Sequence, residues 1–291
     1  MYPGFNLGYT LLNMAEKRKK IFPFSSLVYL TLFLLAIYVY KNPDTKDKVK
    51  PYAKISYAYA LNLRDLIEAP FYKHVSGYSI KLPKKYTVHG IDVSHHQQYI
   101  DWSRVSKMHA QGQSIKFAYC KATEGLDHSD RHFSHNKKRS KEHQISFGAY
   151  HFFRPKKDGK QQAEFFLNTV GDLAPADMVP VVDIEVLDRV SPSTMRKRLK
   201  DFLLHIESTI GVKPMIYTGD VFYKDYLKGY FPKYRIWIAN YSNGTQSSEK
   251  RWTMWQHSQT ATVDGIPGKV DMNVFYGNWE QFKKAMLIGF Q

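Results

Sequence analysis

Apolar runs of strand length alternate with amphipathic stretches from residue 86 onward. Runs typical of strands lie near 88–93, 114–121, 146–153, 178–185 and 213–218. Helical periodicity falls between and after them, over Trp102–Gln111, Asp130–His143, Lys160–Val170, Pro192–Ile210 and Phe222–Tyr230. Three more strand-like runs follow at Tyr234–Asn240, Arg251–His257 and Val270–Tyr276, with too little sequence between them for full helices. The alternation predicts an α/β protein, a TIM-like barrel whose last crossovers are reduced.

The twenty residues 21–40 contain no charged side chain. As a helix they would span about 30 Å, the thickness of a bilayer's hydrocarbon core. A basic cluster at residues 17–20 precedes the run and a Lys- and Tyr-rich segment follows it, while no small-x-small cleavage site is found. We therefore expect a cytoplasmic tail (1–20), a transmembrane signal anchor (21–40), a juxtamembrane stalk (41–85) and a barrel domain (86–291).

The net charge of +16 is concentrated near the amino terminus. Residues 1–87 hold 14 Lys and Arg against 5 Asp and Glu, whereas the remainder holds 28 against 21. Lipid headgroups explain a basic juxtamembrane segment, and no motif typical of nucleic-acid binding accompanies the charge. The single cysteine, Cys120, excludes an intrachain disulfide. The oligomeric state is left open.

Two carboxylates end the apolar run at residues 179–185 (VPVVDIE). Side chains alternate faces along a strand, so Asp183 and Glu185 point the same way, about 6.6 Å apart along the chain. This spacing suits acid-catalysed cleavage of a glycosidic bond. The plain alternative is a solvated pair of acids at a strand end.

Polar residues also recur at the ends of the other predicted strands. They are Asp92, Glu124, Tyr150, Asp183 with Glu185, Tyr217, Asn240, Gln256 and Asp271. In barrels of this kind, chemistry gathers at the carboxyl ends of the strands. Such a ring of acids and aromatics predicts a cleft lined for a sugar.

Eight short motifs occur in a fixed order along the chain. They are 89–97 (HGIDVSHHQ), 121–125 (KATEG), 148–153 (GAYHFF), 183–185 (DIE), 217–219 (YTG), 237–241 (WIANY), 255–256 (WQ) and 271–275 (DMNVF). Together they resemble the family 25 glycoside hydrolases, the lysozymes that act as N-acetylmuramidases. The resemblance covers about residues 86–280 and leaves out the apolar segment and the stalk.

The resemblance implies a (β/α)5β3 barrel that cleaves the β-1,4 bond between N-acetylmuramic acid and N-acetylglucosamine in peptidoglycan, without a metal or cofactor. Glu185 would be the general acid and Asp183 its neighbour, which stabilises charge or orients the substrate. Asp92 and Asp271 would be further cleft acids. An acid that protonates a glycosidic oxygen near neutral pH needs a raised pKa, which burial and nearby carboxylates provide.

Six residues are predicted to bind substrate: Tyr150, Tyr217, Trp237, Asn240, Trp255 and Gln256. For the four aromatic residues, packing in the barrel core is an equal alternative. His95 and His96, beside Asp92, lack a further His or Cys at ligand spacing, so local hydrogen bonding is favoured over a metal site.

The sequence thus predicts a muramidase in the cytoplasmic membrane with its barrel on the cell-wall side. A wall-binding module without catalysis and a chitinase-type hydrolase are the rivals. Retention of configuration is expected, through either the substrate's acetamido oxygen or an aspartate nucleophile.

Overall fold

The computed structural model describes residues 68–241 and 252–290, and nine further residues between Leu34 and Ser56. The chain divides into two units, Met1–Ile67 and Glu68–Gln291. The second unit carries the barrel and all of the features discussed below.

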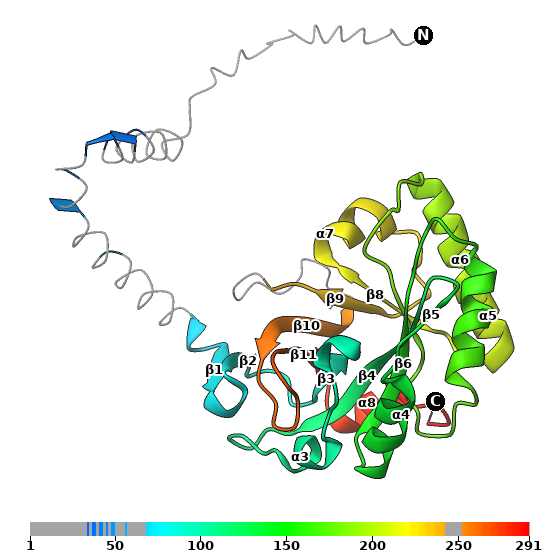
Figure 1. The fold of residues 1–291 in the computed structure, drawn as a ribbon, viewed down its shortest axis with the longest axis horizontal. Helices are drawn as coiled ribbons and strands as arrows, with labels where there is room; N and C mark the ends of the chain where they lie inside the picture. Colours follow the sequence, from blue (N-terminus) through cyan, green and yellow to red (C-terminus); the bar gives the residue numbers. More distant parts are fainter. Residues whose placement is uncertain are drawn as a thin grey trace, which may run out of the picture. The chain divides into compact units, whose positions relative to one another are not determined.

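Eight strands close into a barrel (Figure 1). They are β3 (His89–Val93), β4 (Ile115–Glu124), β6 (Ser146–Phe152), β7 (Val181–Asp183), β8 (Met215–Gly219), β9 (Ile236–Ala239), β10 (Trp252–Ala261) and β11 (Val270–Phe275). Neighbours from β3 through β4, β6, β7, β8 and β9 to β10 are parallel, whereas β11 is antiparallel to both β10 and β3. The two-residue β5 (His128–Ser129) adds to the end of β4.

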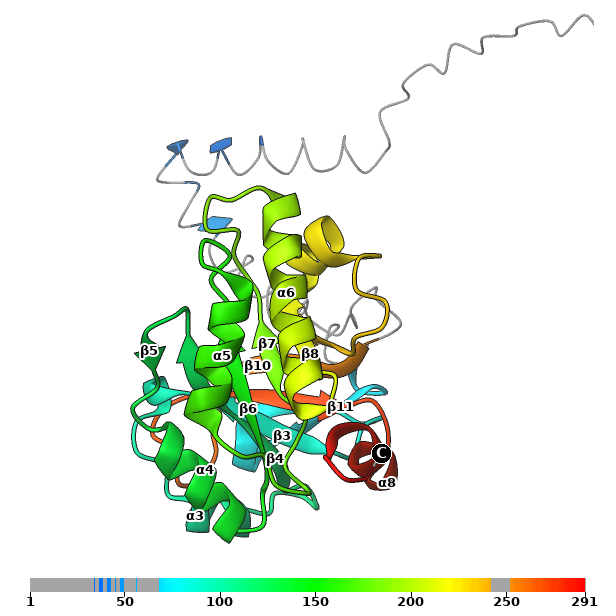
Figure 2. The same cartoon turned by 90° about the vertical axis from the view of Figure 1, so that its right-hand side faces the viewer.

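Helices cover mainly the parallel part of the barrel (Figure 2). They are α3 (Trp102–Lys107), α4 (Phe133–Glu142), α5 (Gly159–Val170), α6 (Pro192–Ile210), α7 (Asp220–Phe222) and α8 (Trp279–Met286), with short 3₁₀ turns η1 (Ser76–Tyr78) and η2 (His95–Gln97) and a π turn η3 (Tyr223–Leu227). The longest, α6, begins after the N-cap Ser191, whose hydroxyl accepts from the Thr194 N–H, and ends at Gly211 in the left-handed conformation.

The prediction of a (β/α)5β3 barrel of the TIM kind is wrong for this structure, which is a closed barrel of mixed strand direction with few helices. The fifth crossover shows the reason. The stretch predicted as helix 222–230 forms only the three-residue α7 and a π turn. The first crossover holds only the six-residue α3, because the chain is extended at Met108. Helical periodicity in these stretches overstated their length.

The transmembrane part of the fold prediction finds no support. Residues 21–40 lie outside the described residues, apart from three isolated positions. Among the residues that are described, no helix is long and apolar enough to cross a bilayer.

Aromatic side chains fill the barrel interior. Tyr119 on β4 and Trp237 on β9 belong to strands that are not neighbours, yet their ring centres lie 5.1 Å apart, so they meet across the interior. The rings need glycine opposite them: a Cβ at Gly148 would lie 2.3 Å from the Tyr119 ring. This packed interior leaves the open space at one rim of the barrel.

A β-hairpin precedes the barrel. Its strands β1 (Tyr72–Val75) and β2 (Ile80–Pro83) are antiparallel, and four of its apolar residues, Val75, Tyr78, Ile80 and Leu82, belong to the same hydrophobic cluster as Trp252 and Trp255 of β10. The end of the segment predicted as a stalk is therefore packed against the barrel.

Candidate active site

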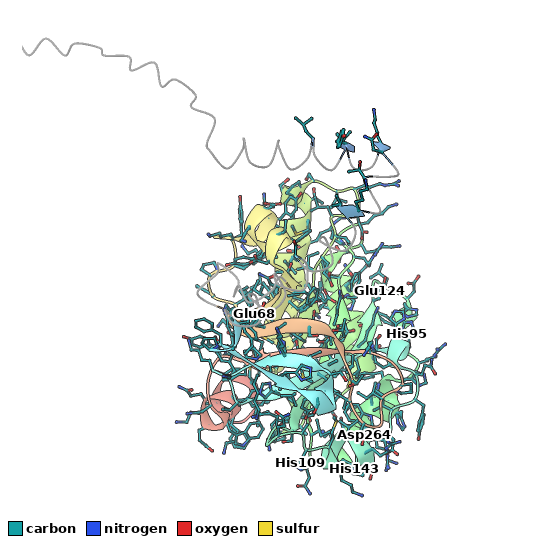
Figure 3. The ribbon with its side chains drawn as sticks, turned by 90° about the vertical axis from the view of Figure 1, so that its left-hand side faces the viewer. Glu68, His95, His109, Glu124, His143 and Asp264 are labelled. Carbon is teal, nitrogen blue, oxygen red and sulfur yellow. The ribbon has the colours of Figure 1, made fainter. Side chains whose placement is uncertain are left out.

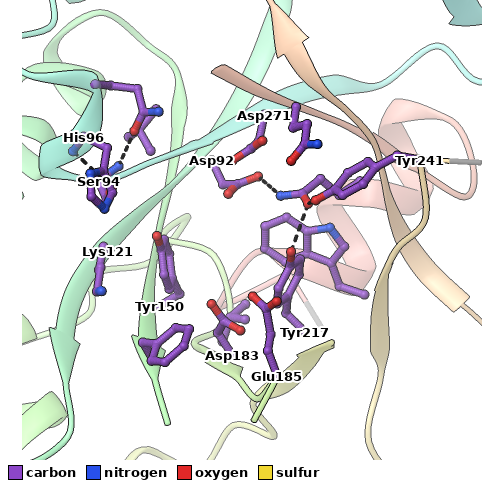
Figure 4. A pocket seen from close by; sticks show the side chains of 17 residues that line it. Asp92, Ser94, His96, Lys121, Tyr150, Asp183, Glu185, Tyr217, Tyr241 and Asp271 are labelled. Carbon is purple, nitrogen blue, oxygen red and sulfur yellow. Dashed lines mark hydrogen bonds between the residues drawn. The ribbon is translucent and has the colours of Figure 1, made fainter. Parts of the chain in front are cut away.

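A cavity of about 340 Å³ opens at the carboxyl ends of the parallel strands (Figure 4). Its lining includes all four predicted acids and four of the predicted binding residues. The complete lining is Asp92, Val93, Ser94, His96, Gln97, Lys121, Tyr150, Phe152, Val181, Asp183, Glu185, Tyr217, Trp237, Tyr241, Gln256, Gln259 and Asp271. Carboxylates, amides and aromatic rings thus surround one polar space.

Asp183 and Glu185 enter this cavity from the end of β7. The backbone there is held on both sides: the Phe153 N–H donates to the Asp183 carbonyl (2.8 Å) and the Ile184 N–H donates to the Tyr217 carbonyl (3.0 Å). Asp183 is 7% exposed, whereas Glu185 is exposed to the cleft. Figure 4 shows the two carboxyl groups side by side.

Burial raises the pKa of both members of this pair. The pKa of Asp183 lies well above its ordinary value of 3.8, first because of burial and then because of the nearby Glu185 charge and a hydrogen bond shared with Glu185. The pKa of Glu185 is also raised by burial, and the shared bond partly offsets this. The pair therefore retains a proton at a pH where ordinary carboxyl groups are ionised.

Asp92 is held in a different way, by neutral donors. Its Oδ2 accepts from Gln256 Nε2 and from Asn273 Nδ2, each at 2.7 Å. The Trp237 indole N–H donates to Asn273 Oδ1 (3.0 Å) and so orients that amide. Burial raises the pKa of Asp92 to about 6, although the two amide bonds oppose the shift.

The Gln256 amide is oriented in turn by two phenols. Its Oε1 accepts from Tyr217 OH at 2.9 Å and also from Tyr241 OH. With its oxygen satisfied in this way, the amide presents its N–H group to Asp92. The resulting chain of side chains fixes the position of the Asp92 carboxyl group.

Asp271 lies directly opposite Asp92 in the antiparallel pairing of β11 with β3. Burial raises the pKa of Asp271 to about 8, and the charges of Asp92 and Glu185 add to the effect. Two carboxylates in such a cross-strand pair repel when both are ionised. Asp271 is consequently the protonated member of the pair at neutral pH.

The predicted residues are not all placed around this cavity. Tyr150, Tyr217, Trp237 and Gln256 line it, while Asn240 and Trp255 do not. Trp255 is 3% exposed, and its indole N–H donates to the Asn240 carbonyl (2.9 Å), so the two fix the chain just before Tyr241. His95 makes the local hydrogen bond expected of it, with its Nδ1 2.8 Å from Asp130 Oδ2.

Sequence reasoning missed Tyr241, Asn273 and Lys121 as parts of the site. Asn273 follows Asp271 at the same two-residue spacing that singled out Asp183 and Glu185, so strand alternation could have found it. Lys121 lines the cavity and pairs with Glu124 (2.7 Å), a carboxylate that the cavity lining does not include. No local pattern distinguishes this lysine from its neighbours.

A closed barrel with two carboxyl groups of raised pKa, one buried and one facing a polar cleft at its rim, has the arrangement that a glycoside hydrolase requires. Residues 91–266 match the family described as "Glycosyl hydrolases family 25". The chain belongs to this family, as its sequence motifs indicated.

Known proteins agree with this assignment. The chain is 42% identical to the uncharacterized protein YegX of Escherichia coli K12 over 228 residues, which are 78% of this chain and 84% of YegX. It is 33% identical to lysozyme M1 of Streptomyces globisporus over 206 residues, 66% of this chain and 68% of the lysozyme.

Solved structures give the same result. The bacterial lysozyme from Streptomyces coelicolor matches with a TM-score of 0.62 and 32% identity, over 68% of this chain and 96% of the lysozyme. A family 25 glycosyl hydrolase from Bacillus anthracis matches with a TM-score of 0.64 and 31% identity, over 70% of this chain and 95% of the hydrolase. The resemblance to family 25 lysozymes and the prediction of a glycoside hydrolase are confirmed.

Proposed function

We propose that this glycoside hydrolase is a muramidase, which cleaves the β-1,4 bond between N-acetylmuramic acid and N-acetylglucosamine in peptidoglycan. The observation that carries the proposal is the Asp183–Glu185 pair, which faces Asp92 and Asp271 across one cavity. The lysozymes among its relatives support the choice of substrate.

Glu185 is the proposed general acid because it is the member of the pair that is exposed to the cleft. The proton that the pair retains passes through Glu185 to the glycosidic oxygen as the bond from that oxygen to the anomeric carbon breaks. Water then adds to the anomeric carbon and returns a proton to Glu185. Asp183, buried beside it, is proposed to stabilise the positive charge that develops on the sugar ring once the pair has given up its proton.

Asp92 and Asp271 are proposed to divide their roles in the same manner. Asp92, whose pKa is about 6, is largely ionised at neutral pH and provides a fixed negative charge. Asp271, whose pKa is about 8, is protonated there and can donate a hydrogen bond to the substrate. Retention of configuration remains our proposal, and a trapped glycosyl-enzyme on Asp183 or Asp92 would exclude the route through the acetamido group.

Six residues are proposed to bind the sugar, directly or by support. Tyr150, Tyr217, Trp237 and Gln256 line the cavity. Asn240 and Trp255 are proposed to position Tyr241, because the Trp255 indole N–H donates to the Asn240 carbonyl and fixes the chain just before Tyr241.

Attachment to the cytoplasmic membrane through residues 21–40, with the barrel on the cell-wall side, is also proposed. The uncharged composition of this segment supports the span. Lysines flank the segment on both sides, so the proposed orientation rests on where peptidoglycan lies. Protease added to intact spheroplasts should cleave the barrel. A barrel that stays uncut, in cells where a periplasmic control protein is degraded, would contradict the proposed orientation.

Digestion of purified peptidoglycan by the full chain tests the proposed reaction. The reducing ends of the products are identified by mass spectrometry, with Glu185→Gln as the control. Products that end in reducing N-acetylmuramic acid, and that are absent with the variant, are expected. Cleavage of chitin oligomers instead would favour a chitinase, and wall binding without any product would favour a binding module.

A further inference from the structure

A second groove of about 410 Å³ adjoins the active-site cavity. Tyr241 and Gln259 line both spaces, so the two share a wall. One side of the groove comes from β10 and the residues around it, and the other side comes from the β1–β2 hairpin. Its lining is Glu68, Tyr72, His74, Ser79, Ile80, Lys81, Tyr241, Trp255, His257, Ser258, Gln259 and Thr260.

The hairpin is a fixed wall for this groove. The Thr262 N–H donates to the Tyr78 carbonyl (3.0 Å), and Tyr78 OH donates to the Gln113 carbonyl (3.2 Å). A Cβ at Gly77 would lie 2.6 Å from the Ala110 side chain, so the turn sits tightly on the barrel. The ion pair of Lys81 with Glu68, which is labelled in Figure 3, ties the segment just before the hairpin to β2 (2.7 Å).

Strand β10 contributes side chains to both the cavity and the groove, because its pairing with β11 is irregular. The register shifts between Gln256 and Ser258 and again between Ser258 and Ala261. Such bulges redirect side chains. Gln256 reaches Asp92 in the active site, whereas Ser258 and Thr260, beyond the first shift, line the groove.

The chemistry of the lining fits a saccharide. Hydroxyl and amide groups from Ser79, Ser258, Gln259 and Thr260 stand beside the aromatic rings of Tyr72 and Tyr241. Aromatic faces with a few convergent polar groups are typical of such sites. The charged groups of the groove include Lys81 and Glu68, which neutralise each other.

We infer that this groove binds sugar units of the glycan strand that lie beyond those held in the active-site cavity, so that the hairpin lengthens the substrate-binding cleft. The inference rests on the proposed function for the identity of the polymer. The hairpin strands, at residues 72–83, precede the segment that matches the family, which begins at residue 91. The hairpin side of the groove therefore lies outside the segment that matches the family, whereas the β10 side lies within it.

A pair of hairpin variants of the full chain tests the inference. Tyr72→Ala/His74→Ala removes two groove-lining side chains, and Lys73→Ala is the matched control, because Lys73 lies between them on the opposite face of β1. Thermal unfolding first establishes that both variants are folded. The substrates are oligomers of alternating N-acetylglucosamine and N-acetylmuramic acid, from four to eight sugars long, with and without peptide stems.

Binding is measured in a Glu185→Gln background and cleavage in the active enzyme. We expect the double variant to bind the octasaccharide about tenfold more weakly, equivalent to about 1.4 kcal/mol, and to bind the tetrasaccharide as the parent does. The KM for long oligomers should rise, with kcat unchanged and with no effect of Lys73→Ala.

Equal loss of affinity for short and long oligomers, or no loss at all, would overturn the inference. So would a loss seen only with oligomers that carry peptide stems, because the groove would then bind peptide. If the octasaccharide binds through the hairpin but the active enzyme cleaves nothing, the inference stands and the proposed function fails.

Discussion

The site contains two pairs of acids that are held in opposite ways. Asp183 and Glu185 stand at the end of β7, in the parallel part of the barrel, and the pKa of each is raised by burial. Asp92 and Asp271 face each other across the antiparallel β3–β11 pairing, and Asp92 is fixed by two amide donors. We propose that the first pair delivers a proton to the substrate, whereas the second pair provides a fixed charge on Asp92 and a hydrogen-bond donor on Asp271. The predictions below test this division.

The largest effect is expected at the exposed member of the first pair. Glu185→Gln removes the proposed general acid while keeping its shape, and we expect kcat to fall by about 10²–10⁴-fold. Stability should change little, since the side chain is exposed. Steady-state kinetics on peptidoglycan measures the effect, with the exposed Glu164→Gln on α5 as control. A decrease in kcat of less than tenfold would show that another residue is the general acid.

The second pair should respond to the loss of its amide donors. Asn273→Ala leaves the buried Trp237 N–H without its acceptor and Asp92 with one donor fewer. We expect the free energy of unfolding to fall by about 1–3 kcal/mol. The pKa of Asp92 should rise above its value of about 6, because the Asn273 bond lowers it. The part of the pH–rate profile that depends on ionised Asp92 should then move to higher pH.

Denaturant unfolding and a pH series of kcat/KM measure the two effects. Asn168→Ala, an exposed position on α5, is the matched control and should leave both unchanged. A variant that loses stability without any change of the pH profile would show that Asn273 supports the fold but not the charge of Asp92.

The two pairs also show which features of the fold and the site could be predicted from the sequence. Each of the eight predicted strands overlaps a strand of the barrel, and α6 spans the predicted range Pro192–Ile210. These features depend on local patterns. The same holds for Asp183 and Glu185, which are two residues apart and were found by alternation alone.

Long-range contacts were beyond such patterns. Gln256 reaches Asp92 across 164 positions of sequence and Asn273 reaches it across 181, so their role depends on barrel closure. The π turn at Tyr223–Leu227 replaced a predicted helix because tertiary packing, not periodicity, decides so short a crossover. The hairpin wall likewise depends on contacts between residues near 78 and near 262.

Asp271 should make the stability of the protein depend on pH. Its folded pKa of about 8 lies above the ordinary 3.8, so the folded state keeps a proton that the unfolded chain releases. This group's contribution to stability is therefore complete below about pH 4 and is lost as the pH rises to about 8. Asp271→Asn should be more stable than the parent at pH 9 by about 1–3 kcal/mol.

Thermal unfolding at pH 5 and pH 9 measures the difference. The stability of the variant should still fall as the pH rises, but less steeply than that of the parent. The remaining dependence comes from Asp92 and Asp183, whose pKa values are also raised. Identical pH dependence in parent and variant would mean that Asp271 is ionised in the folded protein at neutral pH, and that it cannot donate a hydrogen bond to the substrate.

The smallest effects are expected from removing the hydroxyl groups of the two tyrosines that orient Gln256, and the two variants should differ. Tyr241 is 42% exposed and lines both the cavity and the hairpin groove, so Tyr241→Phe should leave stability unchanged and raise KM about two- to fivefold. Tyr217 is buried, and Tyr217→Phe should instead lower the free energy of unfolding by about 1 kcal/mol. Kinetics and unfolding of both variants, measured together, make the comparison. Equal losses of stability would show that the two hydroxyls act as one structural unit, and that Tyr241 has no separate part in binding the substrate.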